Sequence, residues 1–505
     1  MKRSVAVLGL DGMPWSYLKK LFNYGVMPYT KHLVQKSFNA VLEAYPPSTP
    51  PSWASIMTGV NPGKHGIFGF FHYDRKSWKQ RLYTALDLEH PRVHEMLSMI
   101  GQKSIVFNPI PDYPIIPVSN AIIISNLFFT PKPLSTPHDA YKKYFKNEDP
   151  QKYTTAISCR ILEDYVKVLE IYEEAIDIVL KDEYSLLWIN LNIPDIFFHR
   201  CPEILHNDHI LKGEFKVFGK LDKIVELLRE NHDTLILVSD HGFSKYDMLV
   251  SVNDILIRHG LAKASSHQQT AEVGDYRIKE HLARVERPKE IKIPPTAYKL
   301  IKRLKITPLA RWLLNIYKVI TGSKVIVQTS KWINIKDSEA FIPDHYAFGV
   351  YIKDKAKLPA VMNILKRYSS IITALNPYEF YEGPLIDRAP DIVVFPNFNA
   401  GYTLGGSNII GSPVTKGKYY GHHPSGILTV STDYVRINLS ETITVPNYVI
   451  GSLVLWLLNQ PLPKTRDRFP ALDRELLNNS HEYDYVPKWK VLVKIHRRII
   501  NPYTY

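Results

Sequence analysis

The chain has 505 residues, of which 45% are hydrophobic, 22% charged and 12% aromatic. This composition excludes a disordered or low-complexity chain, and the length predicts a globular core with at least one insertion. A formal net charge of +14 indicates an anionic partner or substrate, such as a nucleotide, a nucleic acid, a phospholipid head group or a phosphorylated sugar.

The apolar stretches are too short for a membrane span. The best candidate, residues 449–458, is about half of the roughly 20 residues that a spanning helix needs. The apolar run near the start ends at Asp11, which predicts a strand rather than an export signal. Cys159 and Cys201 are too few for a disulfide framework or a cysteine-built zinc site. We therefore predict a cytoplasmic protein whose metals are held by carboxylates and imidazoles.

In the first half, short β-branched apolar runs alternate with longer helical patterns. This alternation predicts an α/β fold with a mostly parallel central sheet and helices on both faces. Polar clusters at Asp11-Gly12, at 192–195 and at 240–242 follow three of the strands, and ligands bind beyond the carboxyl ends of strands in such sheets. The predicted strands are residues 5–10, 104–108, 121–125, 185–190 and 234–239.

The residue composition of the second half differs from that of the first. Segments 297–305 and 309–320 mix aliphatic and basic residues at helical spacing, which suits a membrane surface or an anionic partner. The alternative is a pair of helices that pack on the core and expose a solvated basic face. Likewise, the basic tail docks either on lipid or on the body of the protein. The predicted units are a first part of the core (1–260), a basic helical insertion (261–336), a small α/β cap (337–404), a second part of the core (405–465) and a basic C-terminal tail (466–505).

Three carboxylates and three imidazoles stand at strand ends or in loops and can form two three-ligand metal sites. Mixed Asp/His sites suit zinc, manganese or iron and leave positions open for a substrate. Two such metals about 4 Å apart can clamp both oxygens of a displacement at phosphorus. Each cluster alone also fits an ordinary turn, helix face or strand exit, so the prediction depends on their joint occurrence. The candidate ligands are Asp11, Asp195, His199, Asp240, His241 and His422.

Residues 45–59 contain the candidate nucleophile. Pro50 and Pro51 fit the first turn of a helix, so we expect Thr49 at the N-cap. The positive end of the helix dipole favours phosphate there, and a metal would convert the hydroxyl into an alkoxide nucleophile. The alternative is a threonine that only caps the helix. Rival hydroxyls in the same stretch are Ser48, Ser52 and Ser55.

The order of the motifs resembles the type I phosphodiesterase/nucleotide pyrophosphatase family of the alkaline phosphatase superfamily, over about residues 5–462. The motifs are Leu-Asp-Gly, Thr-Pro-Pro-Ser-Trp with Thr-Gly-Val-Asn-Pro-Gly-Lys-His-Gly-Ile, Pro-Asp-x-x-x-His, Ser-Asp-His-Gly and Gly-His-x-Pro-x-Gly-Ile. Segments 108–114 and 388–392 resemble the prokaryotic branch. The resemblance implies an alkaline phosphatase-like core and a two-metal phosphodiesterase that works through a covalent phosphothreonine intermediate.

The resemblance also implies roles for individual residues. Ser52 stands where eukaryotic nucleotide pyrophosphatases have an Asn that holds the phosphoryl group, so we expect Ser52 to bind substrate, and nucleotide specificity is in doubt. His422 is preferred over His423 because it stands two residues before Pro424. Asp11, Thr49, Asp240 and His241 would hold the metal that activates the nucleophile, and Asp195, His199 and His422 would hold the second metal.

Several alternatives differ in class. A sulfatase needs a Cys-x-Pro-x-Arg-like segment, which the chain lacks, and a phosphoglycerate mutase uses a serine nucleophile. A phosphomonoesterase should present extra positive charge, for which Lys64 and Arg388 are candidates. Transfer of a phosphoryl-linked group to lipid or sugar, and an idle module that binds anionic surfaces, also remain open. The sequence contains no recognised nucleic-acid-binding module.

Overall fold

The computed structural model describes residues 3–265, 290–293, 324–327, 332–405, 411–434, 443–474 and 480–499. The two expected basic helices, 297–305 and 309–320, lie outside the described residues, as does most of the predicted insertion. Within the described residues, no helix combines the length and the apolar character that a membrane crossing requires.

A nine-stranded sheet in the order β22-β2-β21-β9-β1-β8-β5-β6-β7 forms the core. The neighbours from β9 to β6 pair in parallel, whereas β21 and β7 run antiparallel to their neighbours. The predicted mostly parallel sheet is therefore confirmed. The strands are β1 (Val5–Leu10), β2 (Phe38–Glu43), β5 (Ser104–Phe107), β6 (Ala121–Ser125), β7 (Leu134–Thr136), β8 (Leu186–Leu191), β9 (Thr234–Val238), β21 (Ser425–Thr432) and β22 (Thr444–Pro446).

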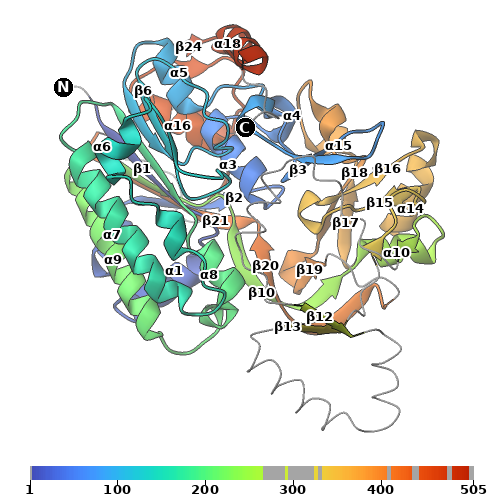
Figure 1. The fold of residues 1–505 in the computed structure, drawn as a ribbon. Helices are drawn as coiled ribbons and strands as arrows, with labels where there is room; N and C mark the ends of the chain where they lie inside the picture. Colours follow the sequence, from blue (N-terminus) through green and yellow to red (C-terminus); the bar gives the residue numbers. More distant parts are fainter. Residues whose placement is uncertain are drawn as a thin grey trace.

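Helices cover both faces of this sheet, because β1, β8 and β9 are buried along their whole length and need cover on each side. Figure 1 shows α7 and α9 side by side on one side of the sheet, and α16, α3 and α5 on the other. The helices are α1 (Trp15–Asn23), α2 (Pro28–Gln35), α3 (Thr49–Thr58), α4 (Pro62–His65), α5 (Val93–Met99), α6 (Ala140–Phe145), α7 (Ile161–Val179), α8 (Asp195–Arg200), α9 (Lys212–Glu230), α16 (Val449–Leu457), α17 (Pro470–Leu472) and α18 (Val486–Ile499).

A smaller unit with its own hydrophobic core lies beside the main sheet (Figure 1). Its four-stranded sheet has the order β15-β16-β18-β17, and its pairs are antiparallel. A three-stranded sheet, β19-β10-β20, leads from the main sheet to this unit. The elements are β10 (Gly242–Val250), α10 (Val252–Arg258), β15 (Ala340–Phe341), β16 (Gly349–Ile352), α14 (Leu358–Lys366), β17 (Ile372–Leu375), α15 (Pro377–Phe380), β18 (Ile392–Pro396), β19 (Tyr402–Leu404) and β20 (Val414–His423).

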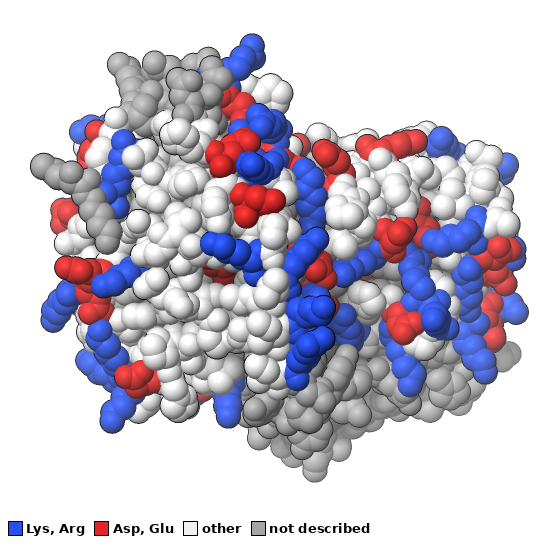
Figure 2. All heavy atoms as spheres, turned by 90° about the horizontal axis from the view of Figure 1, so that it is seen from above, with Lys and Arg blue, Asp and Glu red and all other residues white. Residues whose placement is uncertain are grey.

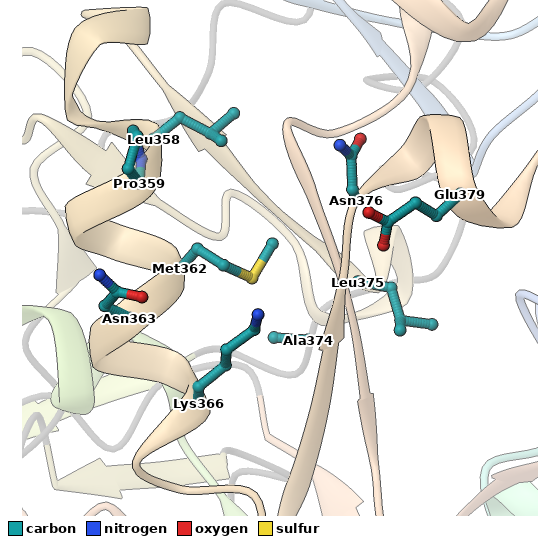
Figure 3. A pocket seen from close by; sticks show the side chains of 9 residues that line it. All are labelled: Leu358, Pro359, Met362, Asn363, Lys366, Ala374, Leu375, Asn376 and Glu379. Carbon is teal, nitrogen blue, oxygen red and sulfur yellow. The ribbon is translucent and has the colours of Figure 1, made fainter.

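The smaller unit carries a groove of about 380 Å³ between α14 and β17. Figure 3 shows Leu358, Met362 and Lys366 on the helical side of this groove, and Leu375 on the opposite side. None of the predicted metal ligands lines it. The groove therefore belongs to the smaller unit and not to the candidate active site.

One covalent cross-link was not anticipated from the sequence. Cys159 and Cys201 form a disulfide that joins two points 42 residues apart. The remaining strands form two-stranded pairs: β3 (Phe71–Tyr73) with β4 (Gln80–Leu82), β11 (Ala264–Ser265) with β14 (Trp332–Ile333), β12 (Glu290–Ile293) with β13 (Lys324–Val327), and β23 (Leu462–Pro463) with β24 (Glu482–Tyr483).

Candidate active site

The carboxyl ends of three neighbouring strands bring the predicted ligands together. Asp11 follows β1, Asp240 and His241 follow β9, and Asp195 begins α8 shortly after β8. These strands end at the same edge because they pair in register, with Leu10 opposite Leu191. The backbone fixes the junction further, since the amide of Asp195 donates to the carbonyl of Asp11 at 2.9 Å.

Two glycines allow the ligand segments to approach one another closely. Gly12 has a φ of +72°, and a Cβ at this position would lie 2.8 Å from the Cβ of Asp195. The amide of Gly12 donates to Oδ1 of Asp240 at 3.1 Å. At Gly242, a Cβ would lie 2.1 Å from the carbonyl oxygen of Ser425. A side chain at either position would push the ligand-bearing segments apart.

His422 joins the cluster through strand pairing. β20 pairs with β10 so that His422 stands opposite Phe243, two residues beyond His241. Nε2 of His422 lies 3.3 Å from Oδ1 of Asp195 and 3.2 Å from Nε2 of His199. Because successive strand residues point to opposite faces, His423 points away from the cluster, and its Nδ1 accepts from the amide of Ser425 at 3.1 Å.

The ligand atoms form two overlapping groups. Asp11, Asp240 and His241 form one group, and Asp195, His241 and His422 form the other, with ligand atoms within 4.8 Å of one another in each. Nε2 of His241 lies 3.6 Å from Oδ1 of Asp11 and 3.3 Å from Oδ2 of Asp240. His241 therefore stands between the two groups, and its ring stacks on that of His422 with centroids 3.9 Å apart.

The donor set fits divalent cations. Among the residues that the structure describes, three buried carboxylate oxygens have no hydrogen-bond partner: Oδ1 of Asp11, Oδ1 of Asp195 and Oδ2 of Asp240. Buried carboxylate oxygens are costly unless they are paired or coordinate a metal. Nδ1 of His241 and Nδ1 of His422 each donate to a backbone carbonyl at 2.9 Å. This tautomer leaves the Nε2 lone pairs free to bind metal.

The electrostatics of the cluster also favour a bound cation. Burial, followed by the charges of Asp240 and Asp195, raises the pKa of Asp11, and burial likewise raises the pKa of Asp240. For Asp195, burial would raise the pKa, but His199 and His422 lower it below its ordinary value. Burial lowers the pKa of His241, which favours the neutral imidazole that a metal binds.

Thr49 lies beside this cluster, with its Oγ1 3.3 Å from Nε2 of His241. The expected N-cap position is wrong by one residue, because Ser48 is the N-cap, with φ −145° and ψ 135°, and Thr49 is the first residue of α3. A proline is tolerated at several positions of a first helical turn, so Pro50 and Pro51 do not fix where the helix begins. The Thr49 hydroxyl still lies at the amino end of the helix.

Ser52, the expected substrate-binding residue, lies one turn into α3 and is buried. Its hydroxyl donates to the carbonyl oxygen of Pro46 at 3.0 Å. To donate to a substrate, this hydroxyl would have to rotate away from Pro46.

A cavity of about 610 Å³ opens onto Thr49, Asp11, Asp195 and His199. The sequence analysis missed the residues of its facing wall because they lie in connecting loops without a motif. One signal was present, since Leu127 to Phe129 follow the end of predicted strand 121–125, where ligands of such sheets gather. The wall residues include Phe70, Phe128, Phe129, Gln151 and Lys152.

Two links tie the wall to α8, which carries two candidate ligands. The disulfide joins Cys159, four residues beyond the wall residue Thr155, to Cys201, which follows α8. Arg200, the last residue of α8, donates to the carbonyl oxygens of Thr154 and Ala156. The helix that carries Asp195 and His199 is therefore fixed to the segment that lines the cavity.

Two cations were considered for a dianionic substrate. Both of them, Lys64 and Arg388, form ion pairs outside the cavity. Nζ of Lys64 lies 2.5 Å from Oδ1 of Asp467. The guanidinium of Arg388 lies 3.0 Å from Oε1 of Glu89. Neither cation lines the cavity that contains Thr49.

The description "Type I phosphodiesterase / nucleotide pyrophosphatase" belongs to a family whose sequence model matches residues 5–408. The chain belongs to this family. None of the curated proteins matches the sequence. Family membership agrees with the order of motifs and with the strand ends on which their residues lie.

Solved structures share the fold at low sequence identity. Murine ectonucleotide pyrophosphatase/phosphodiesterase 5, in an inactive form in complex with AMP, is 14% identical, with a TM-score of 0.53 over 94% of this chain and 100% of that chain. Phosphonoacetate hydrolase from Sinorhizobium meliloti 1021, in complex with phosphonoformate, is 14% identical, with a TM-score of 0.51 over 90% of this chain and 96% of that chain. At this identity the likeness shows the alkaline phosphatase-like fold alone.

Proposed function

We propose that the protein is a metal-dependent phosphodiesterase of the nucleotide pyrophosphatase type that works through a covalent phosphothreonine at Thr49. The observation that carries this proposal is the position of Thr49 Oγ1, 3.3 Å from Nε2 of His241 and at the amino end of α3. The helix end favours a phosphoryl group, and the adjacent buried carboxylates suit cations that would activate the hydroxyl.

Two divalent cations, zinc first and manganese or iron as alternatives, would supply Lewis-acid polarisation of the phosphoryl group and stabilise an ionised threonine. Asp11, Asp240, His241 and Thr49 would hold one cation. Asp195, His199 and His422 would hold the other. The unpartnered carboxylate oxygens and the free Nε2 atoms support this assignment.

The chain's own residues then account for a two-step displacement. The hydroxyl of Thr49 loses its proton and its oxygen attacks phosphorus, while the bond to the leaving alcohol breaks and that alcohol takes up a proton, so that a phosphothreonine ester remains. In the second step, water loses a proton and attacks the same phosphorus, the bond between phosphorus and the Thr49 oxygen breaks, a phosphate monoester leaves, and the Thr49 oxygen takes up a proton. The buried ends of β1, β8 and β9 position Asp11, Asp195 and Asp240, and α3 positions Thr49, so that attack needs little rearrangement.

The disposition of cations supports a diester over a monoester. A diester carries one negative charge at the reacting phosphate, whereas a monoester carries nearly two and should need further cations close by. Lys64 and Arg388 pair with Asp467 and Glu89 away from the cavity. Arg200 donates to two backbone carbonyls, and Lys152 stands on the exposed part of the wall.

The wall of the cavity supports a substrate with an aromatic or nucleoside group. The rings of Phe70 and Phe129 meet edge to face, with centroids 5.7 Å apart. Aromatic side chains of this kind stack on bases at a gain of about 1–3 kcal/mol per base. Lys152 would face a second phosphate of such a substrate. The AMP complex of the murine structural neighbour is consistent with this choice.

The cytoplasmic location and the five predicted units remain part of the proposal. The Cys159–Cys201 disulfide weighs against the cytoplasmic location, since disulfides are rare in the cytosol outside hyperthermophiles.

The experiment compares hydrolysis of bis(p-nitrophenyl) phosphate and p-nitrophenyl phosphate by metal-stripped protein, before and after addition of zinc or manganese. We expect metal-dependent turnover with a preference for the diester. A preference for the monoester would make the protein a phosphatase. Failure to hydrolyse either ester in the presence of metal would contradict the hydrolase and favour a transferase or an idle binding module.

A further inference from the structure

The inner face of α18 is anchored to the body of the protein. Trp489 and Val493, one helical turn apart, are buried in a cluster that includes Ala54 of the nucleophile helix α3. Nε1 of Trp489 donates to the carbonyl oxygen of Leu88 at 3.2 Å. The guanidinium of Arg497 lies 2.8 Å from Oε1 of Glu89. These contacts fix which face of α18 points outward.

The outward face of α18 carries an exposed aliphatic stripe. Val491, Ile495 and Ile499 are four residues apart and therefore lie on one side of the helix. Their exposed fractions are 61%, 49% and 75%. The helix is already held by its buried face, so packing on the body does not explain three large aliphatic side chains in water. We call Val491, Ile495 and Ile499 the outer stripe.

Basic residues accompany the outer stripe. Lys488 and Lys494 lie three residues before and after Val491, and Arg498 lies three residues after Ile495, so each is a neighbour of the stripe on the helix surface. Residues 486–499 contain no Asp or Glu. Figure 2 views the molecule from above, the side on which Figure 1 places α18, and shows Lys and Arg side chains mixed with Asp and Glu side chains across the middle of this face.

We propose that α18 is a docking surface for a membrane that contains anionic lipids. The outer stripe would enter the head-group region while Lys488, Lys494 and Arg498 bind lipid phosphates. An amphipathic helix with aliphatic residues between basic ones binds such a surface through buried apolar area and attraction to anionic lipids. A second copy of the chain is a poorer occupant, because two such helices face to face would bring like charges together.

This surface is independent of the proposed chemistry. The outer stripe belongs to α18, and none of its residues lines the cavity that contains Thr49. Binding to a membrane would hold the enzyme at a source of anionic substrate. A loss of membrane binding would therefore leave hydrolysis of a soluble ester unchanged.

The test is flotation of the full chain with vesicles of phosphatidylcholine alone or mixed with phosphatidylglycerol. We expect binding to the mixed vesicles only, weakened by salt. The variant Val491→Ser/Ile495→Ser/Ile499→Ser should bind at least about tenfold more weakly. Phe215→Ser is the matched control, because Phe215 is 56% exposed on α9, and it should bind like the unmodified chain.

A second variant separates the contribution of charge to membrane binding from that of apolar contact. It also shows whether a loss of binding results from misfolding. Lys488→Glu/Lys494→Glu/Arg498→Glu leaves the outer stripe intact and should also lose binding to the mixed vesicles, while both triple variants keep hydrolysis of a soluble diester. Failure of the unmodified chain to float with the mixed vesicles would overturn the proposal. So would undiminished flotation of the triple serine variant, or a change in its molar mass by light scattering, which would assign the stripe to a contact between copies.

Discussion

Asp240 and His241 are fully buried at the end of a central strand, whereas Phe129, on the facing wall of the same cavity, has 38% of its surface exposed. The ligand cluster is held by in-register parallel strands and by hydrogen bonds from the backbone. The wall comes from connecting segments, tied to α8 by a disulfide and by Arg200. The difference indicates that the sheet fixes the candidate metal ligands, while the loops shape the cavity that faces them.

Loss of the nucleophile should have the largest effect. We expect Thr49→Ala to lower kcat for a diester by at least about 10³-fold, because no covalent intermediate can form. Metal content, measured by plasma emission spectroscopy, should stay close to that of the unmodified protein. The control is Thr58→Ala, which should retain turnover. The hydroxyl of Thr58 lies in the same helix but donates to the carbonyl oxygen of Ala54. Normal turnover by Thr49→Ala would assign the chemistry to another group.

Two adjacent histidines offer a sharper test of the ligand cluster. We expect His422→Ala to weaken binding of one metal by more than about 100-fold, because Nε2 of His422 faces Asp195 and His199. His423→Ala should keep the metal, since His423 lies on the opposite face of β20. Metal titration of the two stripped proteins measures the difference. Equal loss of metal affinity in both variants would show that disruption of β20, rather than removal of one ligand, weakens metal binding.

Loss of the Cys159–Cys201 disulfide should change the affinity for substrate rather than the rate of the chemical step. We expect Cys159→Ser/Cys201→Ser to raise KM for a nucleotide diester several-fold and to leave kcat and metal content nearly unchanged. The closed loop of 42 residues also predicts a loss of roughly 2–4 kcal/mol in the free energy of unfolding. Kinetics and urea unfolding measure the two effects. A fall in kcat with bound metal lost would show that the cross-link holds the ligand helix itself.

The last prediction concerns the stability of the fold rather than turnover, through a buried acid near the base of the wall. Burial raises the pKa of Asp112 to about 7, despite the opposing effect of the backbone amides of Asp112, Phe129 and Thr130. The unfolded chain loses this proton near the ordinary value of 3.8, so the free energy of unfolding should fall as pH rises from there to about 7. The fall should be on the order of a few kcal/mol.

Asp112→Asn should remove this part of the pH dependence. Urea unfolding at both ends of the pH interval measures this dependence, and Asp139→Asn, a substitution of an exposed Asp, is measured beside it. An unaltered slope in Asp112→Asn would show that another group titrates.

The sequence by itself determined five of the nine strands of the main sheet and the identity of the candidate ligands. The five predicted strands match β1, β5, β6, β8 and β9 to within one residue, because buried parallel strands are read as continuous apolar runs. Polar residues directly after such runs had to meet at one edge of the sheet, as Asp11, Asp195 and Asp240 do.

The tertiary structure decided what depends on contacts between distant segments. The pairing of β20 with β10 places His422 among the ligands and turns His423 away. Folding of the loops around 127–129 and 150–155 against α8 creates the wall, and a hydrophobic pattern carries no information about such contacts. The ion pairs of Lys64 and Arg388 likewise became visible only in three dimensions, because their partners lie hundreds of residues away along the chain.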